Sequence, residues 1–238
     1  MNSENKTIVF CDGASSGNPG PGGWGAIVSY PNKKEFLVTE LGGGDKRTTN
    51  NRMELSAAIG ALKFLSDIKN DIVVYTDSSY VINGITKWVF GWQSRNWQTQ
   101  DKKDVSNREL WEELVILVRG KKISWCHIDG HSGIPGNERA DEIATGFSLS
   151  KPPMLFSGKK SGYSVEIDNI TRDEKKYSEK KRSGGKAHSY LSLVDGNFCI
   201  DQTWAECEKR VKGKAGAKFR KSLSVTDEED IKKIWGVK

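Results

Sequence analysis

The sequence lacks paired cysteines. Its four cysteines, Cys11, Cys126, Cys199 and Cys207, lie far apart and form no C-x-x-C pair. A disulfide framework and a structural zinc site both need cysteines at characteristic spacings. Neither is supported here, and we expect four reduced side chains, as is usual for proteins of the cytosol.

The sequence also lacks any long apolar run. No stretch approaches the ~20 apolar residues that a membrane-spanning helix needs. The short N-terminal segment is polar and carries no apolar signal region. We therefore expect a soluble protein with no membrane partner, located in the cytoplasm.

Length and charge set the next bounds. The chain has 238 residues, a formal net charge of +6 and a pI of about 9.0. This length suffices for one domain of ordinary size plus a small second one. Acidic residues remain plentiful, so the basic excess is local and indicates a polyanionic partner.

Five apolar runs read as strands, at residues 7–11, 24–28, 35–39, 71–76 and 122–128. Helical spacing of apolar residues follows residue 50, and further helices are predicted from residues 78 and 137. The glycine-rich segment 13–23 joins the first two strands. Its spacing fits neither a P-loop nor a G-x-G-x-x-G turn, because a strand follows it. We predict a hairpin connection that leaves room for a nucleic-acid backbone.

Four carboxylates fall at the ends or starts of different elements: Asp12, Glu54, Asp77 and Asp141. Any one of them could simply cap a helix or complement its dipole. Carboxylates that converge raise each other's pKa unless a cation lies between them. Mg²⁺ prefers oxygen ligands, and two such ions about 3.5–4 Å apart can activate a water and stabilise a leaving oxygen. The four together predict a site for two Mg²⁺ ions, where Mn²⁺ could substitute.

Several motifs then match a known family. They are Asp12-Gly13, the glycine-rich segment 17–23, T-T-N-N-R-M-E at 48–54, T-D-S at 76–78, G-H-S-G at 130–133 and N-E-R-A-D at 137–141. Over most of residues 7–168 the chain resembles type 1 ribonuclease H. The resemblance implies an α/β fold with a five-stranded mixed sheet and flanking helices. It also implies endonucleolytic hydrolysis of the RNA strand of RNA–DNA hybrids, leaving 5′-phosphate and 3′-hydroxyl ends.

The resemblance also implies roles for single residues. Asp12, Glu54, Asp77 and Asp141 match the family's metal-binding carboxylates, and His131 matches its loop histidine, which assists the attacking water or product departure. The expected substrate-binding residues near the cut are Asn18, Thr49, Asn50, Asn51 and Asn137. Some of them would read the 2′-hydroxyl groups that distinguish RNA from DNA. Ser79 stands where many members carry a glutamine that touches the substrate, which leaves the strength of that contact open.

Residues 87–103 resemble the family's basic protrusion. The resemblance implies that Trp88, Trp92, Lys102 and Lys103 bind the substrate, mainly its DNA strand. Lysines there would neutralise phosphates and make affinity depend on salt. Trp88 and Trp92 are four residues apart, so at least one of them is alternatively expected to pack between helices.

The expected domains are a catalytic domain at 1–168, a basic polar linker at 169–188 and a small domain at 189–238. Twenty flexible residues span about 25 Å r.m.s.. In the small domain Asp195-Gly196 predicts a hairpin, and Thr203 with Glu206 predicts a capping box at the start of a helix. Further strand and helix patterns make this an α+β unit.

This second unit resembles the hybrid-binding domain that many eukaryotic ribonucleases H1 carry at the N-terminus, also seen in viroplasmins. Here it follows the catalytic domain. The resemblance implies that Tyr190 and Trp204 pack on the DNA strand and that Arg220 and Lys221 hold phosphates. Cys207 and Phe219 are expected in its core. Tethering would raise the local concentration of hybrid at the active site of a monomeric enzyme.

Two other hypotheses fit the sequence less well. A hybrid-binding or structural protein on a nuclease fold should have lost some of the four carboxylates, and none is lost. A DNA integrase or transposase of the same architecture would not explain the hybrid-binding resemblance of the C-terminal unit. The sequence therefore favours an enzyme whose partner is an RNA–DNA hybrid.

Overall fold

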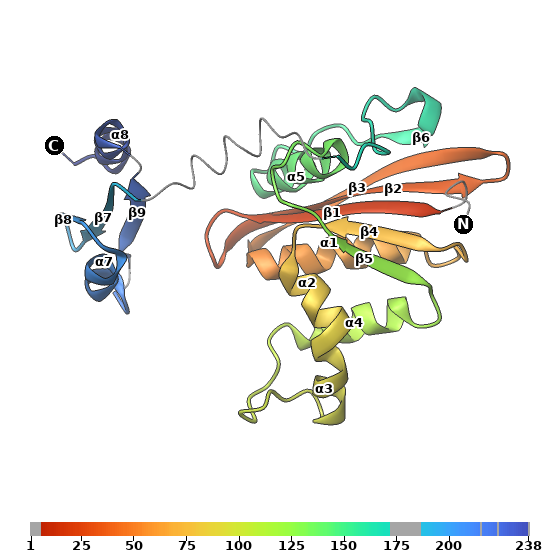
Figure 1. Cartoon of the computed structure of the whole chain (residues 1–238), viewed down its shortest axis with the longest axis horizontal. Helices are drawn as coiled ribbons and strands as arrows, with labels where there is room; N and C mark the ends of the chain where they lie inside the picture. Colours follow the sequence, from red (N-terminus) through yellow and green to blue (C-terminus); the bar gives the residue numbers. More distant parts are fainter. Residues whose placement is uncertain (1–5, 172–186, 215, 223, 238) are drawn as a thin grey trace. The chain divides into compact units, whose positions relative to one another are not determined.

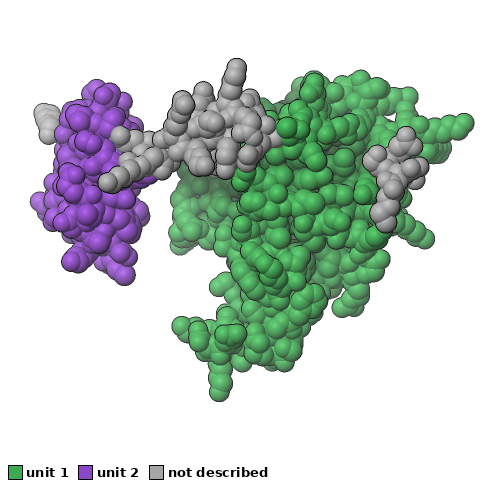
Figure 2. All heavy atoms as spheres, in the orientation of Figure 1, with its two compact units in different colours: residues 1–176 green, residues 177–238 purple. Residues whose placement is uncertain are grey.

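The computed structural model describes residues 6–171, 187–214, 216–222 and 224–237. The chain forms two compact units, residues 1–176 and 177–238, which Figure 2 shows in different colours. Most of the predicted linker lies outside the described residues, so the boundaries at 168 and 189 stay predictions.

The first unit is built on a six-stranded mixed sheet with strand order β5-β4-β1-β2-β3-β6 (Figure 1). Strands β1 (Thr7–Ser15), β2 (Gly20–Asn32) and β3 (Glu35–Thr48) form an antiparallel meander. Strand β4 (Ile72–Thr76) runs parallel to β1, and β5 (Ile123–His127) runs parallel to β4. The predicted α/β class and the mixed sheet are confirmed.

The predicted number of five strands is wrong by one. Strand β6 (Ser157–Lys159) pairs antiparallel with residues Leu37, Val38 and Thr39 of β3. Its sequence, Ser-Gly-Lys, has no apolar alternation, so no pattern could have predicted a strand. Pairing with the outer edge of β3 makes this segment extended.

The connection between β1 and β2 is also shorter than predicted. The strands remain paired through Ser15 and Gly22, so the turn comprises only residues 16–19. Gly13, Gly22 and Gly23, which were predicted to lie in the connection, are ladder residues, and Gly13 lies opposite Trp24. The hairpin itself is confirmed.

Helices cover both faces of the sheet. Helix α1 (Asn50–Phe64) packs on one face, with α4 (Arg108–Val118) packed against α1, and α5 (Pro135–Ser148) packs on the other face (Figure 1). Successive side chains of a strand point to opposite faces. Accordingly, Val9 and Cys11 of β1 belong to the core cluster of α1, whereas Phe10 belongs to the core cluster of α5.

Helix α5 approaches the sheet closely enough to need glycine beneath it. A Cβ atom at Gly23 would lie 2.2 Å from the carbonyl oxygen of Ala144, and one at Gly25 would lie 2.3 Å from that of Ala140. Any side chain at either position would force the helix away from β2.

The segment between β4 and α4 projects from the sheet (Figure 1). It consists of α2 (Ser79–Asn83), a π-helical turn η2 (Gly84–Trp88), α3 (Val89–Ser94) and a loop to α4.

At the far end of α1, the ammonium of Lys121 donates to the carbonyl oxygens of Leu65 and Ser66 at 2.8 Å and of Ile68 at 3.2 Å. These bonds satisfy carbonyls that a helix end leaves unpaired.

The segment after α5 is fixed by one buried carboxylate, Glu40 of β3, whose side chain is 1% exposed. Arg139 of α5 donates to both Glu40 oxygens at 2.8 and 2.9 Å. The Tyr163 hydroxyl donates at 2.5 Å and the Phe156 N–H at 2.9 Å. Beyond the short 3₁₀ turn η3 (Lys160–Gly162), Ile167 is buried against the α5 core cluster.

The second unit is a three-stranded antiparallel sheet with strand order β8-β7-β9 and two helices. Strands β7 (Ser189–Val194) and β8 (Asn197–Asp201) form the predicted hairpin around Asp195 and Gly196, both at positive φ. Strand β9 (Lys218–Ser222) pairs with β7. Helices α7 (Trp204–Val211) and α8 (Val225–Trp235) complete the unit (Figure 1).

Over the described residues, no helix has the length and apolar character needed to cross a bilayer.

Candidate active site and nucleic-acid interface

Four elements bring their carboxylates to one end of the large sheet. Asp12 lies on β1, Asp77 directly follows β4, Glu54 lies in the second turn of α1 and Asp141 lies on α5. Parallel strands such as β1 and β4 end at the same edge, where open α/β sheets form their sites. The Asp12 carboxyl feels the charge of the other three acids. The structure therefore gathers the four residues that the sequence singled out.

Asp12 is the most perturbed member of the group. Asp12 is only 8% exposed to solvent. Burial and then the charge of Asp77 raise its pKa to about 8, with smaller contributions from Asp141 and Glu54. The Gly13 N–H donates to Asp12 Oδ1 at 2.7 Å and opposes this rise. An aspartate carboxyl that is free in solution is ionised at neutral pH. The raised pKa of Asp12 therefore indicates that the site disfavours further negative charge unless it binds a cation.

Glu54 is held by a donor at each carboxylate oxygen. Asn50, one turn earlier on α1, donates from Nδ2 to Oε1 at 2.8 Å. Ser78 donates from Oγ to Oε2 at 2.5 Å. Burial raises the pKa of Glu54 and Asp77 adds to the rise, whereas the two donors lower it. Ser78 was absent from the predicted site residues, although it belongs to the T-D-S motif at 76–78 and to the helix start predicted at residue 78.

Two glycines let these elements meet. A Cβ atom at Gly13 would lie 2.3 Å from the backbone nitrogen of Glu54, so glycine is needed for β1 to approach α1 here. A Cβ atom at Gly130 would lie 2.0 Å from Asp77 Oδ2, so the loop after β5 closes directly over that acid.

His131 lies in this loop at φ +52°, with its side chain 65% exposed. Its Nδ1 is 3.5 Å from Asp141 Oδ2. The Gly133 N–H donates to Glu138 at 3.1 Å, which fastens the loop to the first turn of α5. The imidazole therefore stands beside the carboxylate cluster while it remains open to solvent.

The other predicted substrate contacts in the first unit differ in accessibility. Asn18, at the β1–β2 turn, and Asn51, on the first turn of α1, are exposed. Thr49 precedes α1 as its N-cap residue, and Asn50 is engaged with Glu54. Asn137 is only 2% exposed, and its Oδ1 has no hydrogen-bond partner in the described structure. Exposed Ser79 begins α2.

The projecting segment carries a run of aromatic rings. Trp88 and Trp92 have ring centroids 5.8 Å apart, and Trp92 lies 5.5 Å from the fully buried Trp111. Trp92 packs against the core, whereas Trp88 is 40% exposed. Trp92 therefore has the packing role that was expected of at least one of the two tryptophans. Lys102 and Lys103 lie exposed on the loop that follows.

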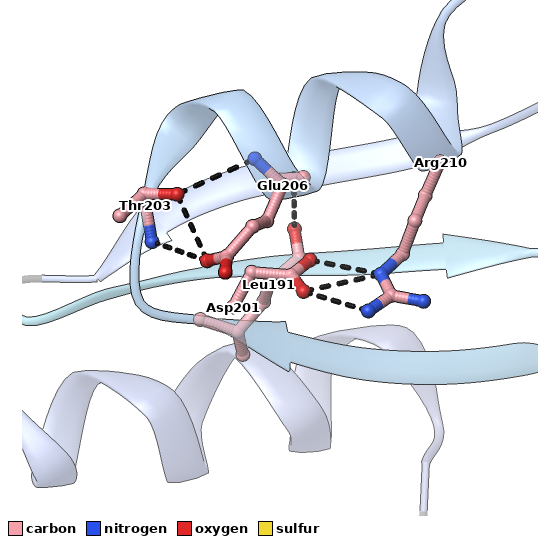
Figure 3. Close-up of polar contacts among 6 residues, drawn as sticks. Leu191, Asp201, Thr203, Glu206 and Arg210 are labelled. Atoms are coloured by element: carbon pink, nitrogen blue, oxygen red, sulfur yellow. Dashed lines mark hydrogen bonds and ion pairs between the residues drawn. The ribbon is translucent and has the colours of Figure 1, made fainter.

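In the second unit, α7 begins at Trp204 because Thr203 forms a capping box with Glu206 (Figure 3). The Thr203 Oγ1 accepts from the Glu206 N–H, and a Glu206 carboxylate oxygen accepts from the Thr203 N–H at 3.1 Å. This start places the Trp204 ring 5.7 Å from Tyr190 and 5.5 Å from Phe219, between centroids. Asp201 and Arg210 form an ion pair at 2.9 Å that joins β8 to α7 (Figure 3).

One expectation for this unit needs correction, and the structure separates two residues that were expected to act together. Phe219 is 53% exposed, so it is not a core residue and instead extends the ring surface of Tyr190 and Trp204. Lys221 pairs with Tyr190 across the β7–β9 ladder and shares its face, but Arg220 pairs with Leu191 and belongs to the opposite face. The structure therefore groups Lys221, but not Arg220, with the aromatic side chains. Cys207 is buried, as predicted.

The donor set at the carboxylate cluster has the chemistry that Mg²⁺ or Mn²⁺ selects, which is oxygen-only and acidic. Across the described ranges, no three His, Cys, Asp or Glu side chains are grouped tightly enough to hold an ion as they stand. Like charges repel when no cation separates them. Burial, and then the charges of the other three acids, raise the pKa of Asp12, so a divalent cation fits the four residues.

Comparisons with known proteins agree on one family. A family model described as RNase H matches residues 4–148. The ribonuclease H of Maricaulis maris is 52% identical over 136 residues, covering 57% of this chain and 89% of that protein. The ribonuclease H of Novosphingobium aromaticivorans is 48% identical over 142 residues, covering 60% of this chain and 96% of that protein.

Among solved structures, the chain is similar to LC9-RNase H1, described as a type 1 RNase H with the type 2 active-site motif. The TM-score is 0.57 at 25% identity, covering 76% of this chain and 87% of that chain.

Proposed function

The chain belongs to the RNase H family and is a ribonuclease H, and we propose that it cuts the RNA strand of RNA–DNA hybrids internally with the help of two divalent cations. The products would carry 5′-phosphate and 3′-hydroxyl ends. The observation that carries this proposal is the meeting of Asp12, Glu54, Asp77 and Asp141 from four elements at one sheet edge.

These four carboxylates would hold Mg²⁺, and Mn²⁺ would be accepted by the same oxygen donors. When bound, the ions supply an activated water and stabilise the leaving 3′-oxygen. The protein's own part is to present its acids together despite their repulsion. The Gly13 N–H fixes Asp12, and Asn50 with Ser78 fixes Glu54.

His131 is suited to move a proton near the reacting phosphate. Its side chain is 65% exposed, and its Nδ1 lies 3.5 Å from Asp141, so the ring can swing between that carboxylate and solvent. An imidazole can accept and release protons near neutral pH. We assign it to the attacking water or to product departure.

Hybrid recognition would use surfaces on either side of the carboxylates. Exposed Asn18 and Asn51 would read the RNA strand, and Thr49 with Asn50 would hold a DNA phosphate. The projecting segment offers Trp88, Lys102 and Lys103 to the DNA strand, with Trp92 supporting the exposed ring. Asn137, buried at the start of α5, would contact substrate only after a local rearrangement.

The second unit would tether the enzyme to its substrate. Tyr190, Trp204 and Phe219 form a ring surface with Lys221 on the same face, a combination suited to a nucleic-acid strand. Arg220 would reach phosphates only from the opposite face. The tether raises the effective concentration of hybrid without adding a catalytic contact. One chain would suffice, acting as a monomer in the cytoplasm.

A cleavage assay tests the catalytic part of this proposal. End-labelled RNA–DNA hybrid, double-stranded RNA and double-stranded DNA are each incubated with the enzyme and Mg²⁺. We expect cleavage of the hybrid's RNA strand alone, its loss on chelation and its abolition by Asp77→Asn. Cleavage of DNA, or full activity with a chelator present, would overturn the proposal.

A deletion tests the tether separately. Removing residues 189–238 should weaken binding to long hybrids and leave cleavage of short hybrids at high enzyme concentration largely intact. An equal loss on both lengths would count against a tethering role.

A further inference from the structure

Resting on the proposed function, we propose that Ser78 is a positioning residue that orients the Glu54 carboxylate for binding a divalent cation. Ser78 was not among the residues predicted from the sequence. Ser78 itself carries no charge. It acts through Glu54, one of the two carboxylates that lie on helices.

The hydroxyl of Ser78 both donates and accepts a hydrogen bond. Ser78 Oγ donates to Glu54 Oε2 at 2.5 Å and accepts from the Val81 N–H at 3.2 Å. Since a hydroxyl has one proton, the Val81 contact leaves that proton for Glu54. The Ser78 N–H donates to Thr76 Oγ1 at 3.1 Å, and the residue is 4% exposed. The donor therefore has little freedom to turn away.

Glu54 is thereby held at both oxygens, because Asn50 donates to Oε1 at 2.8 Å. Each carboxylate oxygen can accept two hydrogen bonds or ligands. One donor at each oxygen fixes the plane of the carboxylate and still leaves a lone pair on each for a cation. Removing Ser78 would free one oxygen and permit rotation about the Glu54 side-chain bonds.

The bond also joins two elements that carry like charges. Glu54 belongs to α1, whereas Ser78 follows Asp77 at the junction of β4 and α2. Carboxylates that are brought together repel each other when no cation lies between them. A short bond from the residue next to Asp77 counters this repulsion and keeps the two carboxylates at a fixed spacing. Loss of such an outer partner of a metal ligand typically costs about 10–100-fold in metal affinity or activity.

Three variants separate this role from helix capping. Ser78→Ala removes the donor and the cap of α2, Ser78→Gly removes the donor but keeps most of the capping preference, and Ser78→Thr keeps both. Mg²⁺ is titrated into the full-length free protein, followed by amide NMR shifts, and urea unfolding is measured alongside. Ser224→Ala is the matched control, because Ser224 caps α8 by accepting from Asp227 N–H at 3.1 Å, far along the chain from the site.

We expect Mg²⁺ affinity to fall about tenfold or more in both Ser78→Gly and Ser78→Ala, to stay near the wild-type value in Ser78→Thr, and to be unchanged in Ser224→Ala. The Mg²⁺ concentration for half-maximal cleavage should rise in parallel. Wild-type Mg²⁺ affinity in Ser78→Gly would overturn the inference, even if the protein were less stable. Failure of the wild-type protein to cut hybrids would instead overturn the proposed function.

Discussion

The buried hydrogen bond from Tyr163 to Glu40 gives the sharpest stability prediction. Tyr163→Phe removes only the hydroxyl that donates to Glu40 Oε1 at 2.5 Å and leaves the ring 4.8 Å from Phe156. Hydrogen bonds to a charged group contribute about 1.5–3 kcal/mol. Because Glu40 is 1% exposed, water cannot replace the lost donor. We expect the free energy of unfolding of the first unit to fall by about this amount at pH 7.

The pH dependence gives a second reading of the same bond. Burial alone would raise the pKa of Glu40, but hydrogen bonds from Arg139, Tyr163 and the Phe156 N–H outweigh it, so the pKa lies below 4.5. A carboxyl whose pKa is lowered on folding stabilises the protein above its unfolded pKa. That contribution is lost as the pH falls through the folded pKa. The difference between wild type and Tyr163→Phe should therefore shrink as the pH falls below the ordinary pKa of glutamate and through the lowered pKa of Glu40.

Urea unfolding followed by tryptophan fluorescence measures this effect, since six of the eight tryptophans belong to residues 1–176. Tyr30→Phe is a suitable control. Its ring is half-buried against Phe64 at 5.3 Å, and the described structure shows no hydrogen bond to its hydroxyl. We expect the control to change stability by less than about 0.5 kcal/mol. A similarly small change in Tyr163→Phe at pH 7, or a difference independent of pH, would refute the reasoning.

Three further predictions follow from single contacts. Gly13→Ala should lower kcat on hybrid by about 100-fold, because its Cβ atom would lie 2.3 Å from the Glu54 nitrogen and displace one of the four carboxylates. A wild-type rate would contradict this. Trp204→Ala should weaken hybrid binding, measured by fluorescence anisotropy, by about 1–3 kcal/mol, the usual contribution of stacking; unchanged affinity would remove the second unit's ring surface from the interface. Lys121→Met should lower the free energy of unfolding by about 1–2 kcal/mol, because the carbonyls at the end of α1 lose their hydrogen-bond donor. Lys122→Met is the control: Lys122 forms an exposed ion pair of 2.6 Å, so its loss should lower the free energy of unfolding by less than about 1 kcal/mol. Equal losses in the two lysine variants would contradict the helix-end role.

The position of the carboxylates was predictable because each follows from local pattern. Apolar runs end at Asp12 and Asp77, and parallel strands bring their ends to the same edge. Helical spacing placed Glu54 near the start of α1. The sequence thus identified which acids meet, although it could not supply their hydrogen-bond partners.

Contacts between distant segments were not predictable in the same way. The bond from Ser78 to Glu54 spans 24 residues, and β6 forms only because β3 offers a free edge. Three residues without an apolar pattern carry no signal of their own. The same reasoning applies to Glu40, whose partners lie 99 to 123 residues further along the chain.

Strand register explains why Phe219 is exposed and why Arg220 and Lys221 lie on different faces. A shift of one residue along a strand exchanges the two faces of a sheet. Arg220 and Lys221 are adjacent on β9, so they cannot both share the face of Tyr190. The ladder with β7 sets Phe219 beside Trp204 and turns Arg220 away, which only the pairing partner could decide.

The close approach of α5 to β2 has a consequence for how this enzyme tolerates change. Main chain meets main chain at Gly23 and Gly25, so the height of α5 above the sheet is set by peptide groups that every sequence shares. Core side chains along α5 can therefore change in size during evolution while Asp141 stays at the same height above the sheet. One added methyl group at either glycine would instead act as a wedge and carry the acid out of reach of its neighbours.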